Sequence, residues 1–426
     1  MNKVKPQHII IIAYILLILI GSIFLILPFS TNGEVSYLNM LFTSVSAVTI
    51  TGLDPIGITE TLTLFGKIVT ALLIQLGGLS IITIQVFLLT LIGAKIGYKD
   101  RDLSKENIGI EHRDGIVKTI KRIVTISVIL ELIGVLLLFP FFMIKGFSFG
   151  KALGHSVFHT ISAFNNAGFS ILGTNSLMIY SENIYFNIIT IVLIILGGIG
   201  TLVIYDVTKN KRWKKINFHS KIVLIMTSIL LLSSGIIFFT LEKNASLVNS
   251  LFHATTIRTA GFHTYDYLNA KTVTLFIMII FMFIGGAPAS TSGGIKVTTI
   301  FTLYKATKAK ITNKTPTYKK RKIPNGYINK AYLILILSLI ITILSTIVIL
   351  IVEDKDFIAV MFEVFSAFSN TGLSLGLTSE LAITSKIVLM IVMLIGRVGI
   401  VTFVGALTFS DKKYENIEYI DLEYLV

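Results

Sequence analysis

The feature that most constrains this chain is a series of largely uncharged apolar runs, each long enough to cross a membrane. The first run extends from Ile9 to Pro28, and further runs lie near 67–94, 123–144, 185–205, 221–241, 272–305, 331–352 and 386–410. A helix needs about 20 apolar residues to cross the hydrocarbon core of a bilayer. The first run is too long for the core of a signal peptide, so we expect it to be retained. The pattern predicts an all-α integral membrane protein with eight transmembrane helices.

Composition agrees with this prediction and excludes several other classes of protein. Hydrophobic residues make up 54% of the chain and charged residues only 14%, whereas a soluble protein is about a quarter charged. The absence of cysteine excludes disulfide scaffolds, thiolate metal sites and cysteine nucleophiles. The net charge of +14 would suggest a nucleic-acid partner in a soluble protein. Here the basic residues lie between apolar runs, so we expect neither a nucleic-acid partner nor an enzyme.

The positions of the basic residues predict the orientation of the chain in a cell membrane. Most Lys and Arg residues lie in the loops at 95–122, 208–221, 305–330 and 411–413, whereas the stretch 29–64 contains none. Cytoplasmic loops of membrane proteins carry the positive excess. We therefore expect both termini to be cytoplasmic and expect the basic loops to face the cytosol, with membrane lipid around the apolar runs.

Four outer stretches resemble one another, which indicates a duplicated unit. Each contains a semi-polar segment that is too short to span, followed by a glycine, at 41–53, 157–169, 251–262 and 361–373. The spacing from phenylalanine to glycine is ten in three copies and nine in the third. A second motif recurs in the following apolar run as Gly77-Gly78, Gly197-Gly198, Gly285-Gly286 and Gly396-Arg397. We expect four units of helix, pore loop and helix, with boundaries at 1–95, 96–207, 208–307 and 308–426.

The repeated unit points to one central pore with pseudo-fourfold symmetry. Non-helical backbone at membrane depth persists only where it is buried in protein or lines water. A ring of backbone carbonyls can replace the water shell of a monovalent cation, and glycine lets a strand turn its carbonyls inward. A single glycine after a helix is usually only a helix cap. Four glycines at matched positions favour a filter, with the negative ends of four short helices directed at the ion.

These segments resemble those of the Trk/Ktr/HKT superfamily of potassium transporters, within which the chain is similar to the Ktr-type membrane subunit. The resemblance covers essentially the whole chain and includes the run at 285–296. It implies that potassium binds at the carbonyls of a selectivity filter with four residues from each unit. These residues are Thr49, Ile50, Thr51 and Gly52; Asn165, Asn166, Ala167 and Gly168; Arg258, Thr259, Ala260 and Gly261; and Ser369, Asn370, Thr371 and Gly372.

The resemblance also implies how the chain works and what it assembles with. A Ktr-type subunit is expected to form a homodimer on a cytosolic nucleotide-binding ring of the RCK type, which gates potassium uptake. The nucleotide is expected only on that partner, because this chain has no phosphate-binding loop and no cofactor site of its own. The alternatives are a sodium/potassium secondary transporter and a less selective monovalent cation transporter. Secondary transporters often use inverted repeats, but the four units here share one orientation.

The sixth apolar run is interrupted by glycine, proline and hydroxyl residues, and a continuous helix through them is disfavoured. The interruption could be a simple kink. The alternative, which the resemblance supports, is a gating loop beneath the filter that contains Gly285, Gly286, Ala289, Ser290, Thr291, Ser292, Gly293 and Gly294. Arg397 lies at similar depth in the last run, where a charge is costly and usually faces a cavity or a partner. We expect it to be a barrier or latch of the gate, or one half of a buried ion pair.

Arg258 lies inside the third filter segment, where a guanidinium directed at the pore axis would oppose a cation. We therefore expect it to point away and to form a structural pair with Glu363 on the fourth short helix. His155, His159, His253 and His263 lie on or beside the short helices without a metal-binding motif. We interpret them as polar helix residues.

Overall fold

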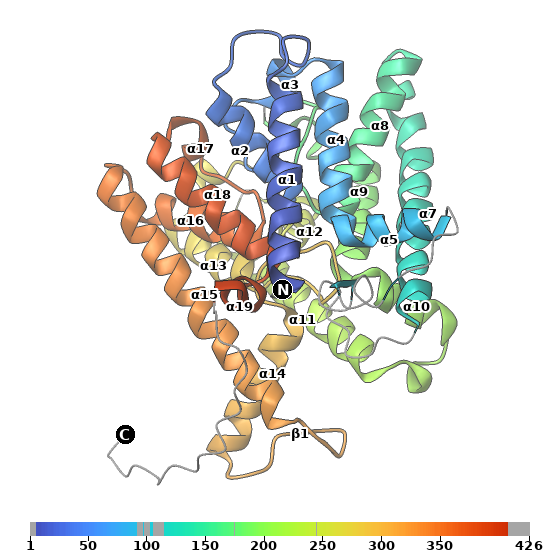
Figure 1. The fold of residues 1–426 in the computed structure, drawn as a ribbon, viewed down its shortest axis with the longest axis vertical. Helices are drawn as coiled ribbons and strands as arrows, with labels where there is room; N and C mark the ends of the chain where they lie inside the picture. The colour runs from blue at the N-terminus through green and yellow to red at the C-terminus, as the bar shows by residue number, and fades with distance from the viewer. Residues whose placement is uncertain are drawn as a thin grey trace.

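The computed structural model describes residues 6–91, 97, 103–104, 115–173, 175–243 and 245–407. The expected cytoplasmic C-terminus at 408–426 and most of the basic loop at 95–114 lie outside the described residues. The described part of the chain is almost entirely helical, as the apolar runs predict (Figure 1).

Four long helices each begin one repeat and are long enough to cross a membrane. They are α1 (Pro6–Ile26), α7 (Ile116–Ile144), α11 (Phe218–Leu241) and α15 (Asn325–Val352), with 21, 29, 24 and 28 residues. At about 1.5 Å per residue, even the shortest of them reaches across a hydrocarbon core of about 30 Å. Each has apolar side chains that are exposed on the outside of the molecule, such as Leu16, Leu136, Leu232 and Ile351. These exposed faces are suited to contact with lipid.

A short helix follows each long helix and ends directly before a filter segment. The short helices are α2 (Tyr37–Val48), α8 (Phe149–Phe164), α12 (Leu247–Thr256) and α16 (Phe357–Ser369). Side chains at the N-caps fix where three of them begin, because Ser36, Ser246 and Asp356 accept hydrogen bonds from backbone N–H groups of the first turn. The short helices are therefore held with their C-terminal ends at the filter.

The inner helices are broken in every repeat, whereas the sequence analysis expected a break only in the third. Three inner spans bend sharply: α4 (Leu64–Leu79) into α5 (Ile81–Leu91) by 89°, α9 (Ile184–Ile199) into α10 (Thr201–Lys209) by 94°, and α18 (Ile383–Val398) into α19 (Ile400–Leu407) by 105°. The residues at the bends, Ser80, Gly200 and Gly399, all have positive φ angles of 67°, 83° and 92°. A left-handed residue cannot continue a right-handed helix, so each helix ends there.

The third inner span has a longer break, as the sequence predicts. α13 (Thr272–Phe283) ends before Gly285, and α14 (Val297–Ile311) begins after Lys296. The two ends of the intervening loop are tied together, because Ile284 and Ile295 form a parallel β-bridge. The interruption is therefore a loop with paired ends, which a simple helix kink would not give.

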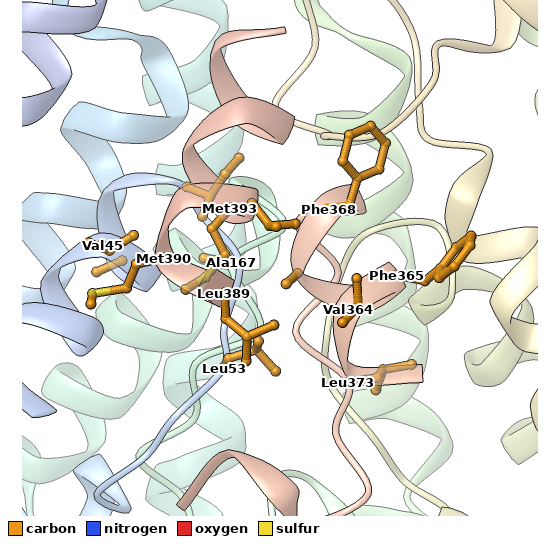
Figure 2. Packing of buried hydrophobic residues seen from close by; sticks show 14 of the residues in the cluster. Val45, Leu53, Ala167, Val364, Phe365, Phe368, Leu373, Leu389, Met390 and Met393 are labelled. Atoms are coloured by element: carbon orange, nitrogen blue, oxygen red, sulfur yellow. The ribbon is translucent and has the colours of Figure 1, made fainter. Parts of the chain in front are cut away.

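The four units follow one another around a common axis. The inner helix of each unit packs against the short helix of the next, in the order α4 with α8, α9 with α12, α13 with α16, and α18 with α2. The last of these contacts closes the circle between the fourth unit and the first. Figure 2 shows part of this closure, where Met390 and Leu389 of α18 lie between Val45 of α2 and Val364 of α16. The contacts give the pseudo-fourfold arrangement that the repeats predict.

Small elements complete the fold at its two ends. α3 (Ile58–Thr61), η1 (Met178–Tyr180), η3 (Tyr267–Asn269) and α17 (Leu377–Glu380) lie between the filter segments and the inner helices. η2 (Trp213–Lys215) precedes α11, and β1 (Thr317–Tyr318) pairs antiparallel with β2 (Arg321–Lys322), with Tyr318 opposite Arg321. The start of α1 lies beside α19, and α14 and the β1–β2 hairpin project below them to the lower end of the view (Figure 1).

Candidate ion pathway

The four filter segments share an unusual backbone conformation. Each has a left-handed residue two positions before its glycine, and the glycine itself also has a positive φ angle. The φ angles are 54° and 92° at Ile50 and Gly52, 56° and 71° at Asn166 and Gly168, 67° and 81° at Thr259 and Gly261, and 53° and 86° at Asn370 and Gly372. None of these four left-handed residues is glycine, and at the β-branched Ile50 and Thr259 the positive φ angle costs of order 1–3 kcal/mol where the surroundings enforce it. The same strained conformation in four copies indicates a shared requirement.

The four glycines form a closed ring in which each one lies against the carbonyl of its neighbour. A Cβ atom added at Gly52 would lie 2.4 Å from the carbonyl oxygen of Ala167, and one added at Gly168 would lie 2.9 Å from that of Ala260. A Cβ at Gly261 would lie 2.3 Å from the carbonyl oxygen of Thr371, and one at Gly372 would lie 1.9 Å from that of Thr51. The contacts therefore run through all four repeats and return to the first. No side chain fits at any of these positions without moving backbone.

Hydroxyl groups on the short helices fasten the strands of the filter to the helices before them. Ser46 and Ser366 accept from the backbone N–H groups of Gly52 and Gly372, each at 3.0 Å. Ser162 donates to the carbonyl of Phe169 at 2.7 Å, and Thr256 donates to the carbonyl of Phe262. The sequence analysis did not single out these hydroxyl residues. Their recurrence at matched places in the four aligned segments was the signal that could have found them.

The filter separates two cavities. The outer cavity, of about 400 Å³, is lined by all four glycines and by Asp54 and Asp266. The inner cavity, of about 260 Å³, is lined by the ends of two short helices at Phe164 and Phe368, by Gly78, Gly197 and Gly396 of the inner helices, and by 289–292. An ion that passed through the ring of glycines would therefore reach the broken inner helix of the third repeat.

The loop between α13 and α14 is fastened beneath the second filter segment. The backbone N–H of Ala287 donates to the carbonyl of Gly198 at 3.0 Å. The hydroxyl of Thr291 donates to the carbonyl of Phe164 at 3.3 Å. The Ser292 hydroxyl lies 3.1 Å from the side-chain amide of Asn166. On the other side of the loop, a Cβ at Gly293 would lie 2.3 Å from the carbonyl oxygen of Ser369. The loop therefore reaches from the second repeat to the fourth.

Arg397 connects this loop to the first repeat. Its Nη1 donates to the carbonyl of Thr291 at 2.8 Å, and its Nη2 donates to the carbonyls of Gly77 and Gly78 at 2.5 and 2.9 Å. Lys296, which the sequence analysis did not single out, lines the same cavity and donates to the carbonyl of Ser292 at 2.5 Å. Two cationic groups therefore lie beside the inner cavity. The expected alternative role of Arg397 in a buried ion pair is not seen among the described residues, where its partners are carbonyls.

The expected pair between Arg258 and Glu363 is wrong. Arg258 donates from Nη2 to the carbonyl of Gly285 at 3.3 Å, whereas Glu363 accepts from the hydroxyl of Thr378. In the part of the chain that the structure describes, the ion pair found is that between Lys355 and Glu380, at 2.6 Å. Because the inner helix of the third repeat ends early at Phe283, a free carbonyl lies within reach of the guanidinium, which a continuous helix would not offer. Arg258 lines a small cavity together with Ile194, Ile195 and Thr227.

Comparison with known proteins gives consistent matches over the whole chain. The family TrkH, described as cation transport protein, matches residues 3–241 and 216–416. Ktr system potassium uptake protein B of Bacillus subtilis is 36% identical over 433 residues, which cover 99% of this chain and 96% of that protein. Potassium/sodium uptake protein NtpJ of Enterococcus hirae is 34% identical over 438 residues, which cover 98% of this chain and 96% of that protein.

A solved structure has the same fold. The crystal structure of the potassium transporter TrkH from Vibrio parahaemolyticus matches this chain with a TM-score of 0.77, at 21% identity, over 96% of this chain and 86% of that one. The resemblance predicted from the filter segments is confirmed, and so is the expectation of a transporter rather than an enzyme. The chain is a multi-pass membrane protein that belongs to the TrkH family of cation transport proteins.

Proposed function

We propose that this chain carries out potassium uptake across the cell membrane and that the ion passes through the ring of Gly52, Gly168, Gly261 and Gly372. The observation that carries the proposal is the closed cycle of contacts between each glycine and the carbonyl before the next one. The cycle contains one backbone carbonyl from each of the four strands. A ring of backbone carbonyls can replace the hydration shell of potassium. Two of the relatives are named as potassium or potassium/sodium uptake proteins, which supports a monovalent cation as the substrate.

The charges around the filter favour entry of a cation from outside. Asp54 and Asp266 line the outer cavity, and four short helices direct their C-terminal ends at the filter. A helix C-terminus carries a partial negative charge of about half an elementary charge. With the basic loops in the cytosol and both termini cytoplasmic, the outer cavity faces the outside and uptake follows the membrane voltage.

We propose that the loop 285–294 is the gate and that Arg397 is its latch. The loop lies directly beneath the filter and is bonded to the second repeat, while Arg397 ties it to α4. Arg397 and Lys296 add positive charge beside the inner cavity, which opposes a permeating cation in a medium of low dielectric constant. This arrangement fits a closed gate. Opening it requires a partner that binds the open arrangement better than the closed one.

The proposed partner is a cytosolic nucleotide-binding ring of the RCK type, on which two copies of this chain would assemble as a homodimer. Support comes from the name of the Bacillus relative, which is a component of a "Ktr system". The inner side of the chain offers basic residues in the segment 209–215 and in the β1–β2 hairpin, which are available to an acidic partner surface. The regulatory nucleotide would bind to the ring.

The test is rubidium and sodium uptake into cells that lack their own potassium uptake, with this chain expressed alone or with a candidate ring subunit. The proposal expects rubidium uptake that excess potassium suppresses and excess sodium does not suppress. Expression of the ring subunit together with the chain should increase this uptake. The alternative is a less selective cation transporter, which the potassium/sodium name of the Enterococcus relative suggests. Such a transporter would admit rubidium and sodium equally. Absence of rubidium uptake in either condition would refute the proposal.

A further inference from the structure

The four filter segments differ in how their first residue is held. In the first and fourth segments this residue is bonded within its own strand: the Thr49 hydroxyl lies 2.7 Å from that of Thr51, and the Ser369 hydroxyl lies 2.6 Å from that of Thr371. In the second and third segments the third residue is alanine, Ala167 or Ala260, which has no hydroxyl. The first residue of these two segments is therefore held from outside the strand, and in the third segment Arg258 binds the carbonyl of Gly285.

Asn165, the first residue of the second segment, is held by a buried polar cluster behind the filter. Its Nδ2 donates to Oε1 of Gln75 at 2.9 Å, to Oε1 of Glu131 at 3.2 Å and to the carbonyl of Ile161 at 2.9 Å. Nε2 of Gln75 donates to Oε2 of Glu131 at 3.0 Å. Both oxygens of the Glu131 carboxylate therefore face amide donors. One of these amides belongs to the filter strand and the other to α4.

Glu131 lies in the apolar helix α7 and has no cationic partner within salt-bridge distance among the described residues. A carboxylate in the membrane is costly, and such residues usually serve a function or have a partner. Here the partners are two neutral amides, and an amide hydrogen bond to a charged acceptor is about twice as strong as one between neutral groups. The cost of burying the charge is therefore offset only through the groups that hold the filter.

The cluster leaves Asn165 no room to move. Asn165 is fully buried, and a Cβ at Gly78 would lie 2.0 Å from its Oδ1. The carbonyl of the same Gly78 accepts from Arg397. The amide is thus packed between α4 on one side and the Glu131 carboxylate on the other, so a change at Glu131 would move the filter strand itself.

We propose that Glu131 is a positioning residue for the second filter segment and thereby helps to determine ion selectivity. Its two carboxylate oxygens orient the amides of Gln75 and Asn165 and so fix the backbone from Asn165 to Gly168. The inference rests on the proposed function, since it assigns a role in the same filter. Glu131 does not touch the ion. It acts through the contact of its carboxyl group with Asn165.

The test compares Glu131→Gln with the parent in rubidium and sodium uptake, together with the cytosolic ring subunit that supports the parent's flux. Glutamine keeps the size of the side chain but turns an NH2 group toward one of the two amide donors, so one hydrogen bond is lost. The expected result is a rubidium-to-sodium preference that falls about tenfold, the equivalent of one lost hydrogen bond to a charged group.

Glu242→Gln is the matched control. Glu242 is also a buried carboxylate, which accepts from the backbone N–H of Lys271 at 3.0 Å, from Thr274 at 2.5 Å and from Tyr265 at 3.2 Å, and none of these residues belongs to the filter. Its loss should lower the thermal stability of the purified protein and leave the ion preference unchanged. Should Glu131→Gln fail to accumulate in the membrane, Gln75→Ala replaces it, because it removes the link between α4 and the same carboxylate.

The outcomes separate this inference from the proposed function. If the parent takes up no rubidium at all, the proposed function fails and the role of Glu131 with it. If the parent is selective and Glu131→Gln or Gln75→Ala keeps its ion preference, Glu131 has a structural role only and the inference is overturned. A preference that falls in these variants but not in Glu242→Gln supports it.

Discussion

Arg397 binds the carbonyl of Thr291 through one nitrogen at 2.8 Å, while its other terminal nitrogen binds the carbonyls of Gly77 and Gly78. One side chain from the fourth repeat therefore connects the broken helix of the third repeat to the inner helix of the first. A planar guanidinium can serve three acceptors in two directions, whereas an ammonium is a point charge with freely rotating donors. The contact explains why an arginine lies in an otherwise apolar span.

Removing this connection should weaken the closed gate. In Arg397→Ala, three hydrogen bonds and one positive charge are lost from the inner cavity, so rubidium flux without the cytosolic partner should rise several-fold. Arg397→Lys keeps the charge but cannot reach both sides, and it should show an intermediate flux. Rubidium uptake into vesicles that contain the purified chain alone measures the effect.

Arg122→Ala provides the control for that prediction. Arg122 lies on α7 with its guanidinium 4.3 Å from the ring centre of Tyr205, which belongs to α10 and not to the loop between α13 and α14. Its removal deletes the same side chain and should leave flux without the partner unchanged. Equal flux in Arg397→Ala and the parent would show that the contact with Thr291 does not hold the gate.

A second prediction concerns Gly52, whose φ angle is 92° and whose missing Cβ faces the carbonyl of Ala167 at 2.4 Å. In Gly52→Ser, the left-handed conformation alone costs about 1–2 kcal/mol, and the clash must displace the neighbouring strand. We expect sodium to be admitted and the rubidium-to-sodium preference to fall. Competition between the two ions in whole-cell uptake measures the change.

Two other glycines of the first repeat separate strain from clash. Gly57 also has a positive φ angle, of 67°, but no atom lies within 4 Å of the position of its Cβ. Gly33 has open space and no unusual backbone angle. Gly57→Ser should cost stability without a change of selectivity, and Gly33→Ser should change neither. If Gly52→Ser keeps the ion preference of the parent, Gly52 is not part of the filter.

The fold could be predicted from the sequence because its determining features are local and repeated. Apolar runs locate the long helices, and the recurring glycines at 52, 168, 261 and 372 locate the four matched strands that we propose as the filter, without any knowledge of contacts. The bends at Ser80, Gly200 and Gly399 were missed, because a bend is decided by one backbone angle within an unbroken apolar run. Alignment of the four inner helices would have found them, since each bend follows the recurring glycine motif by two or three residues.

The side-chain partners were less predictable. Arg258 and Glu363 are opposite charges on adjacent repeats, which favoured a pair. In the structure each binds a residue of its own repeat instead: Arg258 binds the carbonyl of Gly285, and Glu363 binds the hydroxyl of Thr378. The guanidinium depends on a carbonyl that is free only because α13 ends at Phe283. The cluster of Gln75, Glu131 and Asn165 brings together α4, α7 and the end of α8, which are far apart in the sequence. No spacing pattern in the sequence predicts this cluster.

A third prediction follows from the corrected partners of Arg258. Since Arg258 and Glu363 share no hydrogen-bond partner, the effects of Arg258→Gln and Glu363→Gln on stability should add to within about 0.5 kcal/mol. Arg258→Gln should destabilise the protein through its lost contact with Gly285, and neutralising Glu363 as well should not restore it. Thermal unfolding of the purified single and double variants gives the coupling free energy. A double variant that is more stable than Arg258→Gln would instead support a direct interaction between Arg258 and Glu363.

The last prediction concerns the tip of the loop between α13 and α14. The ends of the loop are tied by the bridge between Ile284 and Ile295, and the N–H of Gly285 donates to the carbonyl of Ile295 at 2.9 Å. Deleting 289–292 therefore removes the tip and its contacts with Phe164, Asn166 and Arg397 while the bridged ends can stay paired. Flux without the cytosolic partner should rise at least as much as in Arg397→Ala, because the loop tip that lines the inner cavity is removed together with its contacts to Phe164, Asn166 and Arg397.

Ion selectivity should change little in this deletion. Asn166 loses its contact with Ser292, but the strands of the filter stay fastened to their short helices through Ser46, Ser162, Thr256 and Ser366. Vesicle flux of rubidium and sodium, measured with and without the ring subunit, checks both expectations in one experiment. Combining the deletion with Arg397→Ala supplies the control: if both act on one gate, the double variant should be no more active than the deletion alone. Fully additive increases would mean that Arg397 and the loop restrict the ion at separate places, and a deletion that still needs the partner would place the gate outside this loop.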